Sequence, residues 1–125
     1  MNLKLPLDPL AHGILDARML VERIHTINGA WHALRELWPA TGETSPILTS
    51  MRLMKSTLQA QLLRTHHPLV YLQPDDSPHL PEPCYSLRLS RRIGGHRDAC
   101  HLPLRIASMI FTVDELARFQ HSEQL

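Results

Sequence analysis

The sequence has little cysteine, almost no net charge and no long apolar run, and each shortage excludes a class of protein. Two cysteines in 125 residues do not make a disulfide framework, so both are expected to be reduced. A net charge of +1 excludes a polyelectrolyte that binds by its total charge. No stretch approaches the roughly 18 apolar residues of a membrane span, and no signal-peptide core is visible. We therefore expect a cytoplasmic protein without membrane contact.

Motifs that define common enzymes are also missing. The chain has no phosphate-binding glycine loop, no dinucleotide fingerprint and no G-x-S-x-G nucleophile motif. His96-Arg97-Asp98 matches the start of a kinase catalytic loop, but Pro103 stands where that motif requires asparagine. We expect a protein without catalytic activity, and an active site assembled from scattered histidines and cysteines is the remaining enzymatic alternative.

What is present fits one folded domain. Hydrophobic residues make up 43% of the chain and charged residues 20%, which is typical of a globular protein. Residues 1–125 are predicted to form a single domain. Within it we expect an extended arm over residues 1–12 and an acidic, proline-rich loop over residues 73–83.

Two segments have the apolar spacing of amphipathic helices. In residues 14–38, apolar side chains recur every three or four positions. Ser45 and Pro46 supply an N-cap and a first-turn proline for a second helix, which should end at His67-Pro68. The short connection predicts an antiparallel helical hairpin, and the apolar stripe over 14–38 would also suit a homodimer interface.

Strands are predicted after these helices. Residues 69–72 form a short apolar run, and alternating runs on both sides of Gly94-Gly95 predict a β-hairpin with a two-residue turn. Because Pro103 lacks an amide, the second hairpin strand should lie at the edge of the sheet. Residues 69–72 should then pair with the first hairpin strand.

The chain should end in a helix, because Thr112 and Glu115 have the spacing of a capping box. The predicted fold class is α+β, with the order α-α-β-β-β-α. It comprises a helical hairpin, a three-stranded antiparallel sheet with helices on its apolar face, and a C-terminal helix.

The two-residue turn would sort the hairpin into an apolar face and a basic face. From Cys84 to Ile106 the chain carries five arginines and one aspartate, a net charge of +4. Arginines on a two-stranded ribbon can contact phosphates and bases in a DNA major groove. No aromatic residue lies on this face, which counts against stacking of single strands. The predicted nucleic-acid or anion-binding residues are Arg88, Arg92, Arg97, His101 and Arg105, with Arg52 and Lys55 as auxiliary phosphate contacts.

Two other interpretations of these surfaces are open. The acidic, proline-rich loop and the exposed sheet edge could bind a protein partner by strand addition, as in an inhibitor or adaptor. The arginines could also belong to a solvated sheet face that has no partner.

The candidate ligands of a metal site are His79, Cys84, Cys100 and His101. However, the chain has neither a C-x-x-C nor an H-x-x-x-H spacing, and adjacent Cys100 and His101 should point to opposite faces of a strand. Cys84 and Cys100 also fall on opposite faces in the predicted register, so they should not form a disulfide. No metal or other cofactor is predicted.

Overall fold

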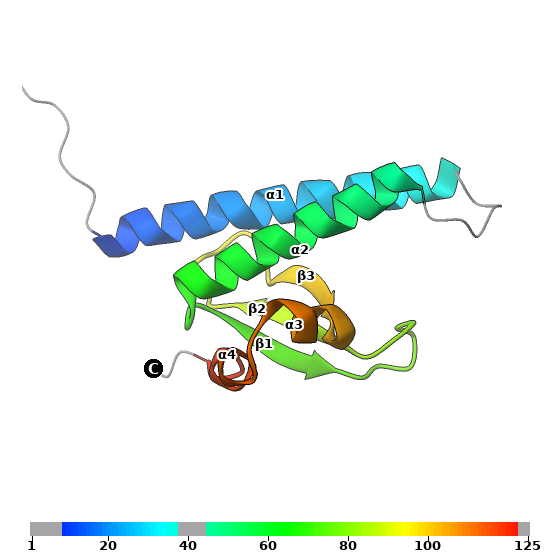
Figure 1. Cartoon of the computed structure of the whole chain (residues 1–125). Coiled ribbons are helices and arrows are strands. Elements are labelled where there is room, and N and C mark those ends of the chain that lie inside the picture. Colours follow the sequence, from blue (N-terminus) through cyan, green and yellow to red (C-terminus); the bar gives the residue numbers. More distant parts are fainter. Residues whose placement is uncertain (1–8, 38–44, 123–125) are drawn as a thin grey trace, which may run out of the picture.

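The computed structural model describes residues 9–37 and 45–122. Two long helices lie side by side over a three-stranded sheet, and two short helices follow the sheet (Figure 1). The α+β class and the predicted order of elements are confirmed, with one additional helix. The elements are α1 (Pro9–Leu37), α2 (Pro46–His66), β1 (Val70–Asp75), β2 (Cys84–Leu89), β3 (Asp98–Pro103), α3 (Leu104–Ile110) and α4 (Val113–Phe119).

Helix α1 begins earlier than predicted. Pro9 occupies its first turn, where a missing amide leaves no helical hydrogen bond unmade. The prediction of an extended arm is therefore wrong for residues 9–12, and residues 1–8 lie outside the described residues. Helix α2 begins at Pro46 and ends at His66, as its flanking prolines predicted. Among the described residues, no helix is long and apolar enough to cross a bilayer.

The sheet has the strand order β1-β2-β3, and both pairs are antiparallel. The edge position inferred for β3 from Pro103 is thus confirmed. Strand β1 is longer than predicted, because it continues through Pro74 to Asp75. A proline is tolerated there since β1 is the other edge strand and needs no amide on its outer side.

The predicted hairpin register is wrong. Tyr85 pairs with Leu102, and Arg88 pairs with Asp98, while residues 90–97 form a long loop in place of a two-residue turn. A two-residue turn would pair Tyr85 with Leu104 and Arg88 with His101, so the register differs by two residues at Tyr85 and by three at Arg88. A two-residue turn at Gly94-Gly95 would place Arg92 opposite Arg97, but both residues lie in this loop.

A β-bulge accompanies the shifted register. Ser86 pairs with His101 and Arg88 with Asp98, so the single residue Leu87 lies opposite both Ala99 and Cys100. Cys100 has a φ of 69°, a left-handed conformation that is unusual for a residue with a side chain. Bulges of this kind bend the strand and redirect a side chain.

Helices cover the apolar face of the sheet and form the core with it. Val70, Leu72, Leu87 and Leu102 are almost fully buried. Burying each such side chain contributes roughly 1.5–3 kcal/mol to folding. From the helices and from Phe111, which follows α3, the same core receives further side chains: Ala17, Leu20, Val21, Ile24, Ala60, Leu62, Leu63, Ala107, Phe111 and Phe119.

Helix α3 was not predicted, because the apolar residues from Leu104 onward were assigned to the second hairpin strand. The strand ends at Pro103, and α3 begins directly after it. The capping box that begins α4 is confirmed: Thr112 Oγ1 accepts from the Glu115 amide, and Glu115 accepts from the Thr112 amide. Arg64 of α2 donates to the Glu115 carboxylate at 2.9 and 3.1 Å and joins α4 to the helical hairpin.

The paired Glu115 carboxylate should make stability depend on pH. The hydrogen bond from Arg64, followed by that from the Thr112 amide, lowers the pKa of Glu115 from 4.5 to about 2. A carboxyl group with a lowered folded-state pKa stabilises the protein above its unfolded-state pKa, and this contribution is lost as the pH falls. Glu115→Gln should therefore reduce the free energy of unfolding at pH 7, and the difference from wild type should shrink between pH 4.5 and 2.

Urea denaturation across this pH range measures the effect. Asp114→Asn is the matched control, because Asp114 lies in the same turn of α4 and makes no ion pair among the described residues. A Glu115→Gln deficit that is equally large at pH 7 and pH 3, or that Asp114→Asn reproduces, would contradict the assignment.

Candidate functional site

A basic surface cleft lies where the loop 90–97 leaves the sheet. Its volume is about 670 Å³. Four arginines line it, and no carboxylate is among the described lining residues. We call this site the arginine cleft; it is lined by Tyr71, Arg88, Leu89, Ser90, Arg91, Arg92, Gly94, His96, Arg97 and Ser122.

The loop that carries the arginines is anchored to the protein body. The side chain of Ile93 is 1% exposed and joins the core. At one end the Ser90 amide donates to Leu69 O at 2.8 Å, and near the other end His96 Nε2 contacts Glu22 Oε1 of α1 at 2.9 Å. The arginines therefore project from a positioned loop, which lowers the conformational entropy lost on binding an anion.

Three of the predicted anion-binding residues, Arg88, Arg92 and Arg97, line this cleft together. Sequence reasoning missed Arg91, because the two-residue turn would have placed it on the apolar face. It also missed Tyr71, which lies on β1 directly opposite Arg88 of β2. An aromatic residue therefore does lie beside the arginines, although it comes from outside the hairpin.

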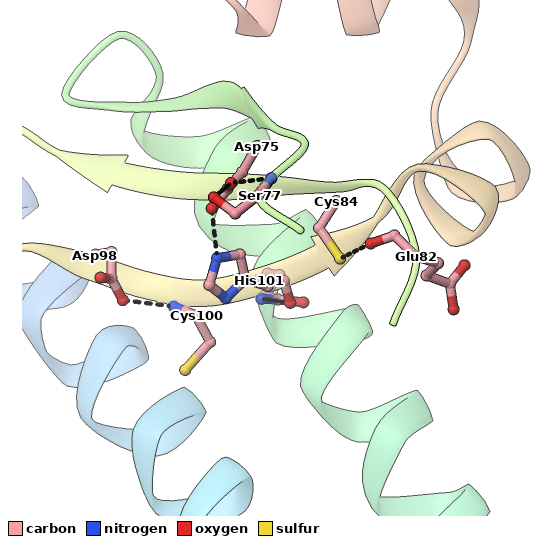
Figure 2. A network of polar contacts seen from close by, with 8 residues as sticks. Asp75, Ser77, Glu82, Cys84, Asp98, Cys100 and His101 are labelled. Atoms are coloured by element: carbon pink, nitrogen blue, oxygen red, sulfur yellow. Dashed lines mark hydrogen bonds and ion pairs between the residues drawn. The ribbon is translucent and has the colours of Figure 1, made fainter. Parts of the chain in front are cut away.

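His101 and Arg105 lie apart from the cleft, beside the acidic loop. His101 Nε2 contacts Asp75 Oδ2 at 3.0 Å, and Arg105 contacts Glu82 at 3.3 Å (Figure 2 shows the His101 pair). Hydrogen bonds from Ser77, with a further one from His101, lower the pKa of Asp75 from 3.8 to about 2. The acidic loop thus pairs with the basic residues at its own end of the sheet.

The two auxiliary residues, Arg52 and Lys55, lie on α2 outside the arginine cleft. The Arg52 guanidinium lies 4.3 Å above the ring of Trp31 in α1. Lys55 Nζ donates to Asn28 Oδ1 at 3.3 Å, and burial lowers the pKa of this lysine. Both side chains contact α1 within the helical hairpin.

A second cluster of reactive side chains lies where α1 meets the start of β3. Single ligand atoms of His25, Asp98 and Cys100 lie within 4.8 Å of one another. We call these residues the His–Asp–Cys cluster. The His25 ring stacks on the ring of His96 at a centroid distance of 4.0 Å, so the cluster adjoins the arginine cleft. Burial raises the pKa of the Cys100 thiol from 9.0 to about 11.

The residues first considered for a metal do not assemble. Cys84 donates to Glu82 O at 3.4 Å, and Figure 2 shows Cys100 pointing away from the pair of His101 and Asp75. Both cysteines are free, as predicted. Among the described residues, the His–Asp–Cys cluster is the only group of three such side chains close enough to share an ion. His25 was missed because no local spacing connects it with Cys100.

Side chains of the helices hold the β3 backbone beside this cluster. Gln59 Nε2 of α2 donates to Ala99 O at 2.9 Å and to His101 O at 3.2 Å. His25 Nε2 of α1 lies 2.8 Å from Asp98 O. These contacts cover the carbonyl groups on the outer edge of β3 around the bulge.

Comparisons of the chain with protein-family models, with curated proteins and with solved structures find no match. The geometry of the arginine cleft and of the His–Asp–Cys cluster is therefore the basis for a functional proposal.

Removing the Gln59 side chain should destabilise the protein. Gln59 is fully buried, and Gln59→Ala would leave two β3 carbonyls without its amide group. A buried acceptor without a partner costs about 1–3 kcal/mol. We expect a loss of this size in urea denaturation, against a change within about 0.5 kcal/mol for Gln61→Ala on the exposed side of the same helix. Equal effects of the two variants would contradict the role of Gln59.

Proposed function

We propose that the protein binds nucleic acid and holds the phosphate backbone of a single strand in the arginine cleft. The observation that carries this proposal is the gathering of four arginines in one cleft of about 670 Å³, with no carboxylate among its described lining residues. Positive charges held close together repel one another, and a bound anion removes that cost. The volume falls within the roughly 300–1,000 Å³ of ligand pockets, which suits a nucleotide-sized group.

The charge of the cleft is available to a ligand. Arg88, Arg91 and Arg97 make no ion pair with any described residue, whereas Arg64 and Arg105 are paired with glutamates. A guanidinium group can donate two parallel hydrogen bonds to a phosphate, so arginines suit this ligand better than lysines.

Tyr71 favours a single strand over a duplex. Tyr71 pairs with Arg88 across the two strands and lines the cleft, where an unpaired base could stack beside a bound phosphate. The arginines of the loop 90–97 do not form the paired ribbon on which insertion into a major groove was first based. The cleft therefore suits a single strand that is bound through its phosphates and a stacked base better than a duplex whose base edges are read in the major groove.

The acidic loop limits where a polyanion can lie. Asp75 and Glu82 lie near Cys84, and the arginine cleft lies near Leu89 at the other end of β2. These two ends are about 17 Å apart at the rise of a β-strand residue. Negative charge lies at one end, and at the other end Arg88, Arg91 and Arg97 make no ion pair with a described residue. This arrangement favours a nucleic-acid strand that crosses only the cleft end of the sheet.

The alternative of a protein partner has less support from the contacts. Strand addition at β3 would have to displace the hydrogen bonds that Gln59 and His25 make to its carbonyls. On α1, the apolar residues Ala17, Leu20 and Ile24 are buried in the protein's own core, so they are not free for a homodimer interface.

Charge removal in the cleft tests the proposal. Binding of a single-stranded oligonucleotide should weaken as salt rises, and Arg91→Gln/Arg97→Gln should flatten that dependence. Each phosphate contact to a single strand contributes about 0.7 to the slope of log K against log salt, so the slope should fall by about 1.4. Fluorescence anisotropy over a salt series gives the slope. Arg23→Gln/Arg35→Gln, which removes the same charge from exposed positions of α1, should leave it unchanged.

The absence of oligonucleotide binding by the folded protein at low salt would overturn the proposed function. An equal loss in both double variants would assign binding to total charge and not to the cleft.

Stacking on Tyr71 gives an independent prediction. Base–aromatic stacking contributes about 1–3 kcal/mol, so Tyr71→Ala should weaken single-strand binding by about 5- to 150-fold. The salt slope should stay unchanged, because no charge is lost. Tyr71→Phe is the matched control and should bind like wild type. Titration with a single strand and with a duplex of the same sequence measures the preference, and tighter duplex binding would contradict the stacking role.

A further inference from the structure

The His–Asp–Cys cluster has the spacing of metal ligands. Cys100 Sγ lies 3.7 Å from His25 Nδ1, and one ligand atom from each of the three residues falls within 4.8 Å of the others. In a tetrahedral zinc site, bonds of about 2.3 Å to sulfur and about 2.0 Å to nitrogen place these two ligand atoms about 3.5 Å apart. The separation therefore needs almost no change to admit an ion.

The hydrogen bonding of His25 prepares its ring for a metal. Nε2 lies 2.8 Å from the backbone oxygen of Asp98, and a carbonyl oxygen can only accept. Nε2 must therefore carry the proton, so in the neutral ring Nδ1 directs its lone pair toward Cys100 Sγ. Histidines that bind metals usually donate their other ring N–H to a carbonyl or carboxylate in this way.

Strand β3 supplies the other two ligands, the side chains of Asp98 and Cys100. The Cys100 amide donates to Asp98 Oδ1 at 3.0 Å, which fixes the orientation of that carboxylate. Cys100 is 8% exposed and takes the left-handed backbone conformation at the bulge. Such conformations are strained for a residue with a side chain, and they cluster at functional sites. The thiol is thereby held against the ring of a helix residue 75 positions earlier in the chain.

We propose that His25, Asp98 and Cys100 bind a single divalent zinc ion. Nitrogen, sulfur and oxygen donors together suit zinc better than magnesium or calcium, which take oxygen ligands. Three protein ligands leave a fourth position for a water molecule or a further ligand, as in zinc sites that are not purely structural. This site does not depend on the proposed binding of nucleic acid.

Zinc at this position would link α1 to β3. Because His25 also stacks on His96 of the loop 90–97, the ion would restrain one wall of the arginine cleft as well. The alternative without an ion is a hydrogen bond between the Cys100 thiol and Nδ1 of His25, and the experiment has to separate the two.

Cobalt(II) titration of the reduced, full-length protein distinguishes a bound ion from a hydrogen bond between the thiol and the imidazole. Cobalt can replace zinc in such sites, and its absorption spectrum reports whether a thiolate is a ligand. We expect a sulfur-to-cobalt charge-transfer band in the near ultraviolet that zinc then abolishes by displacement. Cys100→Ser should remove the band. Cys84→Ser, which removes the other free, buried cysteine, should retain it.

The nitrogen and oxygen ligands have their own variants. His25→Gln and Asp98→Asn should each weaken cobalt binding by at least about tenfold. His101→Gln serves as the control, because His101 contacts Asp75 and lies outside the cluster. Circular dichroism of each variant confirms that it is folded.

Any of these spectroscopic results would overturn the proposal: no charge-transfer band in wild type, a band retained by Cys100→Ser, or unchanged affinity in both His25→Gln and Asp98→Asn. Should the cluster variants fail to fold, wild-type protein decides the matter. Zinc should raise its melting temperature, since a ligand that binds only the folded state stabilises it. A melting temperature that is the same with and without zinc also overturns the proposal.

Discussion

The hydrogen bonds that α1 and α2 make to the carbonyls of β3 are the contacts on which the rest of the structure depends. Gln59 and His25 reach across from the two helices to the outer edge of the strand. They fasten the helical hairpin to the sheet at the bulge, where a regular strand pairing is interrupted. Without these hydrogen bonds, the helices would cover β3 and leave its backbone carbonyls without donors. The loss in folding free energy would be comparable to that of several ordinary hydrogen bonds.

The bulge and the loop that precedes it create both candidate sites. At the bulge opposite Leu87, the Cys100 thiol lies 3.7 Å from Nδ1 of His25, and residues 90–97 lie outside the pairing of β2 with β3. This loop carries arginines that a tight turn would have distributed over two faces of a ribbon. His96 belongs to the arginine cleft and stacks on His25 of the cluster, so the two sites share a boundary.

Charge is arranged along β2 in a way that total composition conceals. The net charge of the chain is only +1, yet one end of β2 is acidic. There Asp75 pairs with His101, and Glu82 pairs with Arg105. At the opposite end Arg88, Arg91 and Arg97 make no ion pair with any described residue. Pairing at the acidic end weakens its field, whereas the guanidinium groups of these three arginines keep theirs.

The amino-acid sequence alone determined the features that depend on neighbouring residues. Prolines on both sides of α2 set its ends, Thr112 and Glu115 began α4, and the missing amide of Pro103 placed β3 at an edge. These signals act over a few positions, because each concerns a backbone hydrogen bond or a dihedral angle of the residue itself. Only the tertiary structure decided the length of the loop 90–97, the bulge at Cys100, and the approach of Tyr71 and His25 to the hairpin. Those outcomes depend on which register buries the most apolar surface under α1 and α2, and no local pattern of residues carries that information.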